Sequence, residues 1–323
     1  MNALINFVHN PPSEENKMTQ KHIKIATRKS KLALWQANFV KSALENRYPE
    51  LQVSLFEMVT EGDRQQNIPL TQMGGKSVFV KSLQNALLNN EADIAVHSIK
   101  DMSVHDANGL TLAAICERKD ARDAFISNHY ADIDTLPLNA VVGTASPRRE
   151  SLLKSMRPDI QITLLRGNVD TRLSKLDNGD YDAIILAAAG IHRLGLSNRI
   201  RSYLSDDFFI PAIGQGAIGV ECRTDDHFIR DLSHFLNHTE TANAVIAERV
   251  VNKILGGDCH TAIGAHAKIT GSTMHLAAMI GSQDGKLILR ATADSNTIEP
   301  KTLGERVAND LISQGAQRLI HHA

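Results

Sequence analysis

Apolar and polar positions along the chain alternate in some segments with the two-residue period of a strand and in others with the roughly 3.6-residue period of a helix. Because such segments follow one another, the chain is predicted to alternate between strands and helices. Short apolar or alternating runs predict strands at residues 22–27, 51–59 and 92–97. Between them, apolar residues at helical spacing predict helices over residues 30–46 and 78–89. This order of elements is typical of a mostly parallel sheet that is covered by helices.

The first predicted helix carries both a start signal and an apolar stripe. Ser30 precedes the periodic segment, and its hydroxyl can accept a hydrogen bond from a backbone N–H of the first turn. Large apolar side chains recur along the helix at Leu32, Trp35, Phe39 and Leu44. We expect these four residues to form its buried face.

The same order of elements returns further along the chain. Strands are predicted at residues 140–146, 160–165 and 181–187, with a helix over 169–179. A further helix is predicted to begin at Pro147, because proline is favoured at the first helical position. In both halves a helix and a polar turn lead to an aspartate and a buried-type strand, which favours two α/β domains of like architecture.

Towards the C-terminus the pattern changes. Residues 238–255 predict one amphipathic helix, and residues 264–270 and 274–281 predict two strands. A hairpin is expected around Gly285, and a last helix from about Pro300. These elements predict a small α+β third domain that begins near residue 238.

Length and charge narrow the class of protein. A chain of 323 residues is too long for one ordinary core, and its formal net charge of -1 provides no overall field towards nucleic acid or membrane. The longest apolar run, Ala183 to Ile191, is far shorter than the roughly 20 residues that span a bilayer. Residues 1–21 lack the regions of a signal peptide and are expected to be a loose extension, with Met18 as a possible alternative start.

The cysteines indicate the redox environment. Three cysteines lie far apart without the spacing of metal ligands, at Cys116, Cys222 and Cys259. An odd number of separated cysteines favours reduced thiols in a cytoplasmic compartment. No histidine pair has the spacing of metal ligands either, so no metal site is expected.

Two short motifs resemble nucleotide-binding loops but fail on their surroundings. Residues 214–219 fit G-x-G-x-x-G, yet they follow Pro211 and lead into an extended segment rather than a helix. Gly75-Lys76-Ser77 resembles the end of a phosphate-binding P-loop, but Leu70 stands where the first glycine is required. Neither motif therefore predicts a nucleotide site.

Arginines gather where predicted strands end and helices begin. In an open α/β sheet these positions lie at the edge where ligands bind. Basic residues at a helix N-terminus oppose the helix dipole, so several of them together favour a site for an anionic ligand with several carboxylates or phosphates. A solvated surface position remains the alternative for any single one. These arginines are Arg28, Arg148, Arg149, Arg166, Arg172 and Arg193.

Two further residues are candidates for chemistry. Asp101 closes the segment after the strand at 92–97, as either a salt-bridge partner or the single anion of a cationic cleft that stabilises a transient cation. Cys259 lies in a glycine-flanked turn, where a thiol is either inert or a point of covalent attachment. The neighbouring His260 is a poor candidate for its catalytic base, because adjacent residues rarely face each other.

The order and spacing of these motifs resemble the porphobilinogen deaminase family, also called hydroxymethylbilane synthases. The resemblance extends from about His22 to near the C-terminus. Its motifs are ATRKSKLALWQ (26–36), GGKSVFVKSLQNALL (74–88), ADIAVHSIKDM (92–102), RDAFIS (122–127), VVGTASPRRE (141–150), the segment 164–196 that begins LLRGNVDTR, PAIGQGAIGVECR (211–223) and GGDCHTAIGA (256–265).

The resemblance implies a three-domain organisation. Two domains have the α/β fold of type II periplasmic binding proteins, and a small C-terminal α+β domain carries the cysteine. The expected ranges are 22–117 with 216–236 for a discontinuous domain 1, 118–215 for domain 2 and 237–323 for domain 3, after an extension over residues 1–21. The glycine-rich segment after Pro211 then becomes a hinge and a strand rather than a nucleotide loop.

The resemblance also implies the activity. Four molecules of porphobilinogen are deaminated and joined head to tail into linear hydroxymethylbilane, with release of four ammonia molecules. The chain grows on a dipyrromethane cofactor that a thioether links to the loop cysteine, here Cys259. The implied partner is this small-molecule substrate, with neither nucleic acid nor membrane, and the implied state is a cytoplasmic monomer.

The resemblance assigns roles residue by residue. Asp101 matches the catalytic aspartate, which also contacts the cofactor. The other implied cofactor-binding residues are Cys259, Lys100, Ser146, Arg148 and Arg149. The implied substrate-binding residues are Arg28, Ser30, Arg166, Arg172 and Arg193.

The chain departs from the family pattern at several positions. Asp258 replaces a usual glycine before the cysteine, and Ala262 replaces a common proline after it. A carboxylate beside the thiol is expected to disfavour the thiolate and slow cofactor attachment. The other departures are Lys31 and Ser103 for frequent prolines, and Gln72 and Thr163 for residues that are basic in some members.

Two alternative functions follow from the same residues. A non-catalytic binder of anionic pyrroles or other polycarboxylates would keep the fold without loading the cofactor. An anion-binding protein of the periplasmic type is disfavoured by the third domain and by the missing signal peptide. The intact Asp101 and arginine set favour the enzyme.

Overall fold

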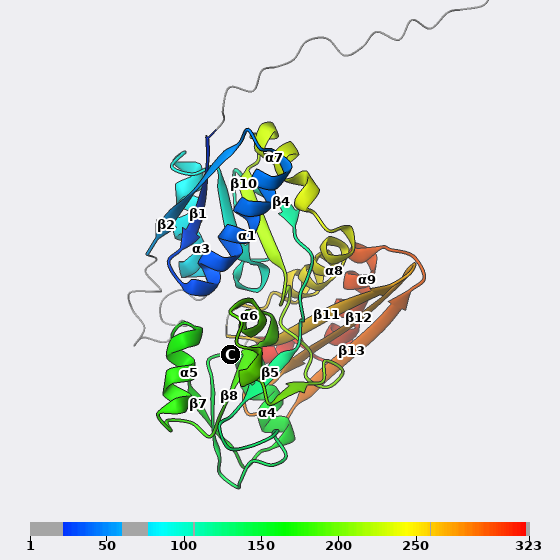
Figure 1. Cartoon of the computed structure of the whole chain (residues 1–323). Helices are drawn as coiled ribbons and strands as arrows, with labels where there is room; N and C mark the ends of the chain where they lie inside the picture. The colour runs from blue at the N-terminus through cyan, green and yellow to red at the C-terminus, as the bar shows by residue number, and fades with distance from the viewer. Residues whose placement is uncertain (1–21, 60–76, 106, 259, 321–323) are drawn as a thin grey trace, which may run out of the picture.

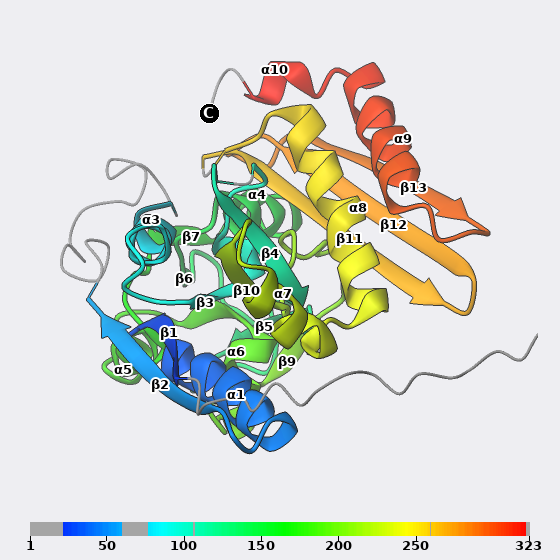
Figure 2. The ribbon, with the colours of Figure 1, turned by 90° about the horizontal axis from the view of Figure 1, so that it is seen from above.

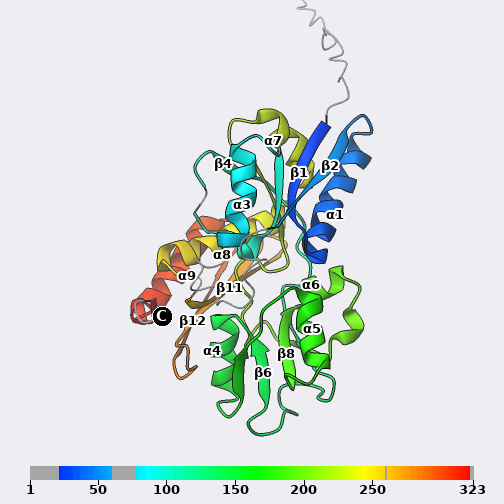
Figure 3. The same ribbon diagram turned by 90° about the vertical axis from the view of Figure 1, so that its left-hand side faces the viewer.

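The computed structural model describes residues 22–59, 77–105, 107–258 and 260–320. Two α/β units lie one above the other, and a third unit of one sheet and helices lies beside them (Figures 1 and 3). Within these residues no helix is long and apolar enough to cross a membrane.

The first sheet has the strand order β2-β1-β3-β10-β4. Strand β1 pairs in parallel with β2 and β3, whereas β10 is antiparallel to both of its neighbours. Because β10 comes from a distant part of the sequence, the first unit is built from two stretches of chain. Its elements are β1 (His22–Arg28), α1 (Lys31–Arg47), β2 (Gln52–Met58), α3 (Ser77–Leu88), β3 (Ile94–Ser98), a 3₁₀ turn (Ile99–Asp101), β4 (Leu110–Ile115), β10 (Ile218–Arg223) and α7 (His227–Ser233).

The second sheet repeats this design with the order β7-β6-β8-β5-β9. Strand β6 is parallel to both of its neighbours β7 and β8, and β5 is antiparallel to its neighbours β8 and β9. The predicted likeness of the two α/β units is thus confirmed. The elements are β5 (Asp123–Ile126), β6 (Val141–Thr144), α4 (Pro147–Met156), β7 (Gln161–Leu164), α5 (Val169–Asp177), β8 (Ala183–Ala187), α6 (Ala188–Arg193) and β9 (Ser202–Leu204).

The expected buried face of α1 is wrong in part. Trp35 is 36% exposed and Phe39 is 42% exposed, and their rings stack on each other with centroids 5.7 Å apart. The helix instead packs on the sheet through Ala37, Val40 and Leu44, which are fully buried. The apolar stripe is therefore rotated, because smaller residues fit close to the strands while the two rings stay at the edge.

The third unit is an antiparallel sheet with helices on one face (Figure 2). One apolar core joins both long helices to all three strands. The predicted α+β character of this region is confirmed. Its elements are α8 (Thr239–Leu255), β11 (Ala262–Thr270), β12 (Thr273–Gly281), β13 (Ile288–Ser295), α9 (Pro300–Ser313) and α10 (Gln317–Ile320).

A buried carboxylate ties the third unit to the chain segments that cross between the first two. Glu248 of α8 accepts hydrogen bonds from the Arg118 guanidinium at 2.8 Å, the Gly214 N–H at 2.7 Å and the Ala267 N–H at 2.8 Å. Its side chain is fully buried. Arg118 lies on the crossing segment between β4 and β5 (116–122), and Gly214 lies on the crossing segment between β9 and β10 (205–217). The Glu248 side chain therefore links both segments to the third unit.

The β12–β13 hairpin packs tightly against helix α4 at Gly285. A Cβ atom built there would lie 2.6 Å from both the Ser151 carbonyl oxygen and the Ser155 nitrogen, and the residue has φ +71°. We expect Gly285→Ala to lower the free energy of unfolding by about 3 kcal/mol, because backbone strain and overpacking add. Gly271→Ala is the matched control with φ +61° and open space around it.

Urea denaturation of both variants measures the difference. The control retains only the backbone strain, about 1 kcal/mol. Equal losses in the two variants would show that the contact between the hairpin and α4 does not constrain Gly285.

Candidate active site

The carboxyl ends of the parallel strands in domains 1 and 2 face each other across a cleft. A cavity of about 430 Å³ is lined from both domains, and a second cavity of about 790 Å³ adjoins it towards domain 3. Side chains at the junction line both cavities. Among them are Lys100, Asp101, Ser146, Arg148 and Arg166.

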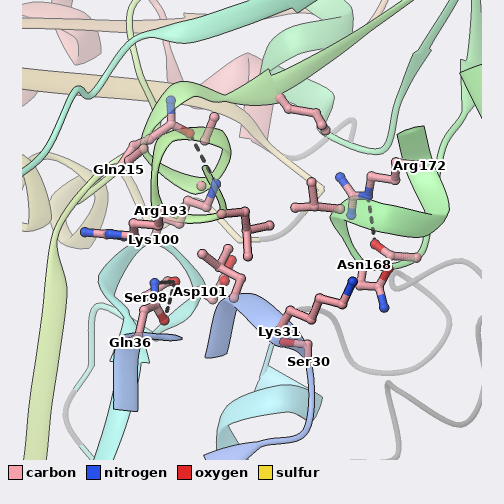
Figure 4. A pocket seen from close by; sticks show the side chains of 18 of the residues that line it. Ser30, Lys31, Gln36, Ser98, Lys100, Asp101, Asn168, Arg172, Arg193 and Gln215 are labelled. Atoms are coloured by element: carbon pink, nitrogen blue, oxygen red, sulfur yellow. Dashed lines mark hydrogen bonds between the residues drawn. The ribbon is translucent and has the colours of Figure 1, made fainter. Parts of the chain in front are cut away.

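The turn after β3 places Lys100 and Asp101 in this junction. The Ile99 N–H donates to the carbonyl of Ala217 at 3.1 Å, which anchors the turn to the segment before β10. The Lys100 ammonium donates to Gln215 Oε1 at 3.4 Å (Figure 4). Asp101 is therefore held on a short, anchored turn rather than on a loose loop.

Side chains on α1 and β3 support the same strand end. Gln36 of α1 donates to the Ser98 hydroxyl at 2.8 Å, and both line the cleft (Figure 4). Gln36, Ser98 and Gln215 were absent from the predicted site. Sequence patterns carried no signal for them, because neutral polar residues become recognisable only through their partners in space.

Helix α4 brings Arg148 and Arg149 into the cleft wall. The helix begins at Pro147, as predicted, and Ser146 caps it by accepting a hydrogen bond from the Arg149 N–H. Both guanidinium groups donate to Asp123, which lies at the start of β5 and is fully buried. Asp123 was not predicted from the sequence.

The charges of this triad are coupled. Burial by itself would raise the pKa of Asp123, but Arg148 and Arg149 lower it to about 2, with help from a hydrogen bond donated by Gln215. Burial lowers the pKa of Arg148, against the attraction of Asp123. Asp123 thus stabilises two buried cations at the cleft wall.

Arg148 and Arg149 differ in how many of their N–H donors remain available to a ligand, because residues of the protein already accept hydrogen bonds from some of them. Arg149 donates from Nε and Nη2 to Asp123 and from Nη1 to the Ile185 carbonyl at 2.8 Å. Arg148 donates to Asp123 and to the Ile210 carbonyl, while its buried Nε has no hydrogen-bond partner among the described residues. Both line the cleft, but a large share of their hydrogen-bonding capacity is already used within the protein.

Helix α5 contributes a further cationic side chain, Arg172, to the cleft. Asn168 caps it by accepting a hydrogen bond from the Thr171 N–H, and Arg172 Nε donates to the Gly167 carbonyl at 2.8 Å. Burial and the nearby Arg149 together lower the pKa of Arg172 to about 10, against the attraction of Asp101. Asp101 and the arginines on α4 and α5 therefore share one electrostatic environment.

Arg193 lies after the end of β8, separated from that strand by one short helix. It ends the short helix α6 instead of following β8 directly, and its Nη2 donates to the Gly216 carbonyl at 2.7 Å. Its guanidinium lies over the Trp35 ring, 5.6 Å from the centroid. Burial lowers its pKa to about 10. Arg193 lines the cleft and also joins α6 to α1 and to the crossing segment.

The remaining predicted substrate residues lie at the start of α1 and in the turn before α5. Ser30 caps α1 by accepting a hydrogen bond from the Ala33 N–H at 3.3 Å, and it lines the cleft together with Arg28. Arg166 lines both cavities from the other side. All predicted site residues that the structure describes therefore meet around one cleft.

The turn that carries the predicted tether borders the second cavity. Cys259 itself lies outside the described residues. The neighbouring Asp258 lines this cavity, and its carboxylate accepts from the His260 N–H at 2.8 Å and the Thr261 hydroxyl at 2.9 Å. Burial would raise the pKa of Asp258, but these hydrogen bonds lower it. The carboxylate thus helps to order the turn.

The other two cysteines have a different environment. Cys116 and Cys222 are buried free thiols, and burial raises the pKa of each to about 11. A buried thiol with a raised pKa is a poor nucleophile. Neither is suited to covalent attachment.

The described residues fit a dipyrromethane that carries carboxylate side chains. The second cavity runs from Asp258 and Thr261 to the junction with Lys100 and Asp101, so a group attached at the turn has space to reach the cationic wall. At this wall, the buried Nε of Arg148 is a donor that has no partner in the part of the chain that the structure describes. Guanidinium and ammonium donors are suited to carboxylates, and Asp101 is suited to pyrrole N–H groups.

Comparison with known proteins shows the family of the chain. Residues 23–231 match the family described as "Porphobilinogen deaminase, dipyromethane cofactor binding domain", and residues 242–313 match "Porphobilinogen deaminase, C-terminal domain". The chain therefore belongs to the porphobilinogen deaminase family, which acts on porphobilinogen in tetrapyrrole biosynthesis, and its cofactor is dipyrromethane.

Solved structures of similar shape include bacterial binding proteins. The methionine-binding protein MetQ is 14% identical, with 71% of this chain and 96% of that chain covered at a TM-score of 0.45. A periplasmic substrate-binding protein of an ABC transporter from Coxiella burnetii is 14% identical, with 70% and 96% covered at 0.44. A nutrient-binding protein from Burkholderia cenocepacia, solved with methionine, is 13% identical, with 68% and 93% covered at 0.43. At these scores the likeness says nothing about the ligand.

Proposed function

We propose that this protein deaminates four molecules of porphobilinogen and joins them into linear hydroxymethylbilane, with release of four ammonia molecules and uptake of one water that supplies the hydroxyl group. The observation that carries the proposal is the position of Asp101, a carboxylate at the junction of two cavities whose other charged residues are mainly cationic. Such a site attracts a substrate with carboxylate groups and offers one anion to a positive charge that forms on it.

The cationic wall would bind and orient the substrate. Porphobilinogen carries an acetate and a propionate, and guanidinium groups bind carboxylates through paired hydrogen bonds. Arg28 and Ser30 approach from domain 1, and Arg166 and Arg172 from domain 2. Because contacts come from both domains, binding would favour the closed arrangement of the cleft.

Asp101 would act on the reacting pyrrole. Loss of ammonia breaks a carbon–nitrogen bond and leaves a positive charge that the pyrrole ring shares with its nitrogen. A carboxylate close to the pyrrole N–H stabilises this charge and can hold the proton that is released when the next bond forms. The anchored turn of residues 99–101 would keep the carboxylate in place without reorganisation.

The chain's own residues would also hold the cofactor. When bound, the dipyrromethane would supply the terminal pyrrole carbon to which the first unit is joined. Cys259 would be its tether, and the wall next to the second cavity would bind its carboxylates. The proposed contacts are Lys100, Asp101, Ser146, Arg148 and Arg149.

The intact mass of the purified protein tests the tether. We expect a mass excess of two pyrrole units in the wild type, and none in Cys259→Ala. Cys116→Ala is the control, because this thiol is buried and is expected to leave the excess unchanged. An unmodified wild-type mass that persists after incubation with porphobilinogen would favour a non-catalytic binder of anionic pyrroles.

Product formation tests the reaction itself. Incubation with porphobilinogen should release one ammonia per substrate consumed and yield hydroxymethylbilane. A cytoplasmic monomer is the corresponding proposal for the state of the protein, and light scattering after size-exclusion chromatography measures its mass. Binding of porphobilinogen without release of ammonia would contradict the enzymatic proposal.

A further inference from the structure

The cleft contains a second carboxylate for which the proposed reaction has no task. Among the described residues that line the 430 Å³ cavity, nine are lysine or arginine and two, Asp101 and Asp170, are acidic. Asp101 has a role in the proposed chemistry. Asp170 instead places a negative charge where a substrate with carboxylate groups must bind.

The partner of Asp170 comes from the opposite domain. Lys31 Nζ lies 3.2 Å from Asp170 Oδ1 and donates a hydrogen bond to it, across 139 positions of sequence. Lys31 is the first residue of α1, and Asp170 is the second residue of α5. Figure 4 shows the Lys31 side chain extending across the cleft towards the start of α5, where Asn168 lies.

This ion pair is easily exchanged for another. The side chains of Lys31 and Asp170 are 72% and 41% exposed. Exposed pairs of this kind contribute about 0–1 kcal/mol, so a competing carboxylate can take the ammonium at little cost. The start of α1 also favours an anion near Lys31, because the helix dipole leaves this end partly positive.

We infer that Lys31 is a further substrate-binding residue at the mouth of the cleft, and that Asp170 is the counter-ion that a substrate carboxylate displaces. The inference rests on the proposed function. The Asp170 carboxylate shows that an acetate or propionate group can reach the Lys31 ammonium between the starts of α1 and α5. Asp170 then lowers the affinity for the substrate, whereas Lys31 raises it.

Opposite effects of two single variants test this inference. In steady-state kinetics with porphobilinogen, we expect Lys31→Gln to raise KM about threefold to tenfold, the range of one exposed charge-assisted contact. Asp170→Asn should lower KM about twofold to fivefold, because it removes the competing anion. The value of kcat should stay the same in both, since a contact at the mouth acts on ground state and transition state alike.

A control and a second measurement separate binding from turnover. Lys41→Gln removes another lysine of α1, paired with Glu45 at 3.8 Å on the same helix, and should leave KM unchanged. Calorimetric titration of porphobilinogen into Asp101→Ala, with and without each substitution, should reproduce the opposite shifts in Kd. This measurement does not depend on catalysis.

The outcomes distinguish this inference from the proposed function. Shifts of KM and Kd in the same direction for both variants, with recovery in Lys31→Asp/Asp170→Lys, would show that the pair only bridges the domains and would overturn the inference. Shifts no larger than those of the control would also overturn it, while an active wild type keeps the proposed function. A wild type that neither binds nor consumes porphobilinogen would refute both.

Discussion

Replacing Asp101 by alanine lowers the turnover of porphobilinogen roughly a thousandfold while the fold and the attached cofactor remain. This is the effect of removing one preorganised group that stabilises charge in the transition state. The position of Asp101 supports this expectation. It lies on an anchored turn, and its negative charge raises the pKa of the nearby Arg172. Asp101→Asn should lose nearly as much activity, since an amide keeps the shape but not the charge.

Single-turnover kinetics and intact mass check this prediction together. The control is Asp180→Ala, which removes an exposed carboxylate in the turn before β8 and should keep normal turnover. An Asp101→Ala variant that carries the full mass excess and is as active as the wild type would refute the assigned role. A variant without the mass excess would instead place Asp101 in cofactor attachment.

Replacing Asp123 by asparagine destabilises the protein more than any other single change considered. Its carboxylate is fully buried and accepts from both Arg148 and Arg149. Breaking a buried ion pair by removing one partner costs about 3–5 kcal/mol, because the remaining charge stays buried without compensation. Here two guanidinium groups would remain, so we expect a loss at the upper end of this range in urea denaturation.

Acid denaturation of the wild type is a second test of the interaction of Asp123 with Arg148 and Arg149. The pKa of Asp123 is about 2 in the folded state, below its ordinary value near 3.9. The stabilisation is therefore complete above about pH 4 and is lost as the pH falls towards 2. In Asp123→Asn this part of the acid transition should disappear.

Asp159→Asn is the matched control for the buried position. The Asp159 carboxyl also has a pKa of about 2, held there mainly by hydrogen bonds from Arg157, but it lies at the surface. Solvent reaches and screens this partly exposed pair, so its loss should matter less. Equal destabilisation by the two substitutions would contradict the role of burial at Asp123.

Local signals predicted the elements that position the site. Ser30 was predicted to cap α1 and Pro147 was predicted to begin α4, and both do so in the structure. Caps act within one helical turn, so their residues are neighbours in the sequence. The fold class, the motifs of the family and the cleft around Asp101 followed from such short patterns in their order along the chain.

Local sequence signals could not predict that Trp35 lies partly exposed, or that Arg149 forms an ion pair with Asp123. A helical stripe shows which positions share a face, but the close approach of Ala37 and Val40 to the sheet decides how the helix rotates. Arg149 was predicted as a ligand-binding arginine, yet Asp123 occupies two of its nitrogens from 26 positions away. The periodicity of a sequence does not show which distant residue a side chain will contact.

The amino-acid sequence by itself determined the alternation of strands and helices, the starts of the helices and the residue types of a cationic cleft. These properties depend on periods and caps that span a few neighbouring positions. Only the tertiary structure decided which charges meet, because Lys31 and Asp170, or Gln215 and Asp123, come together through packing of domains that are distant in sequence.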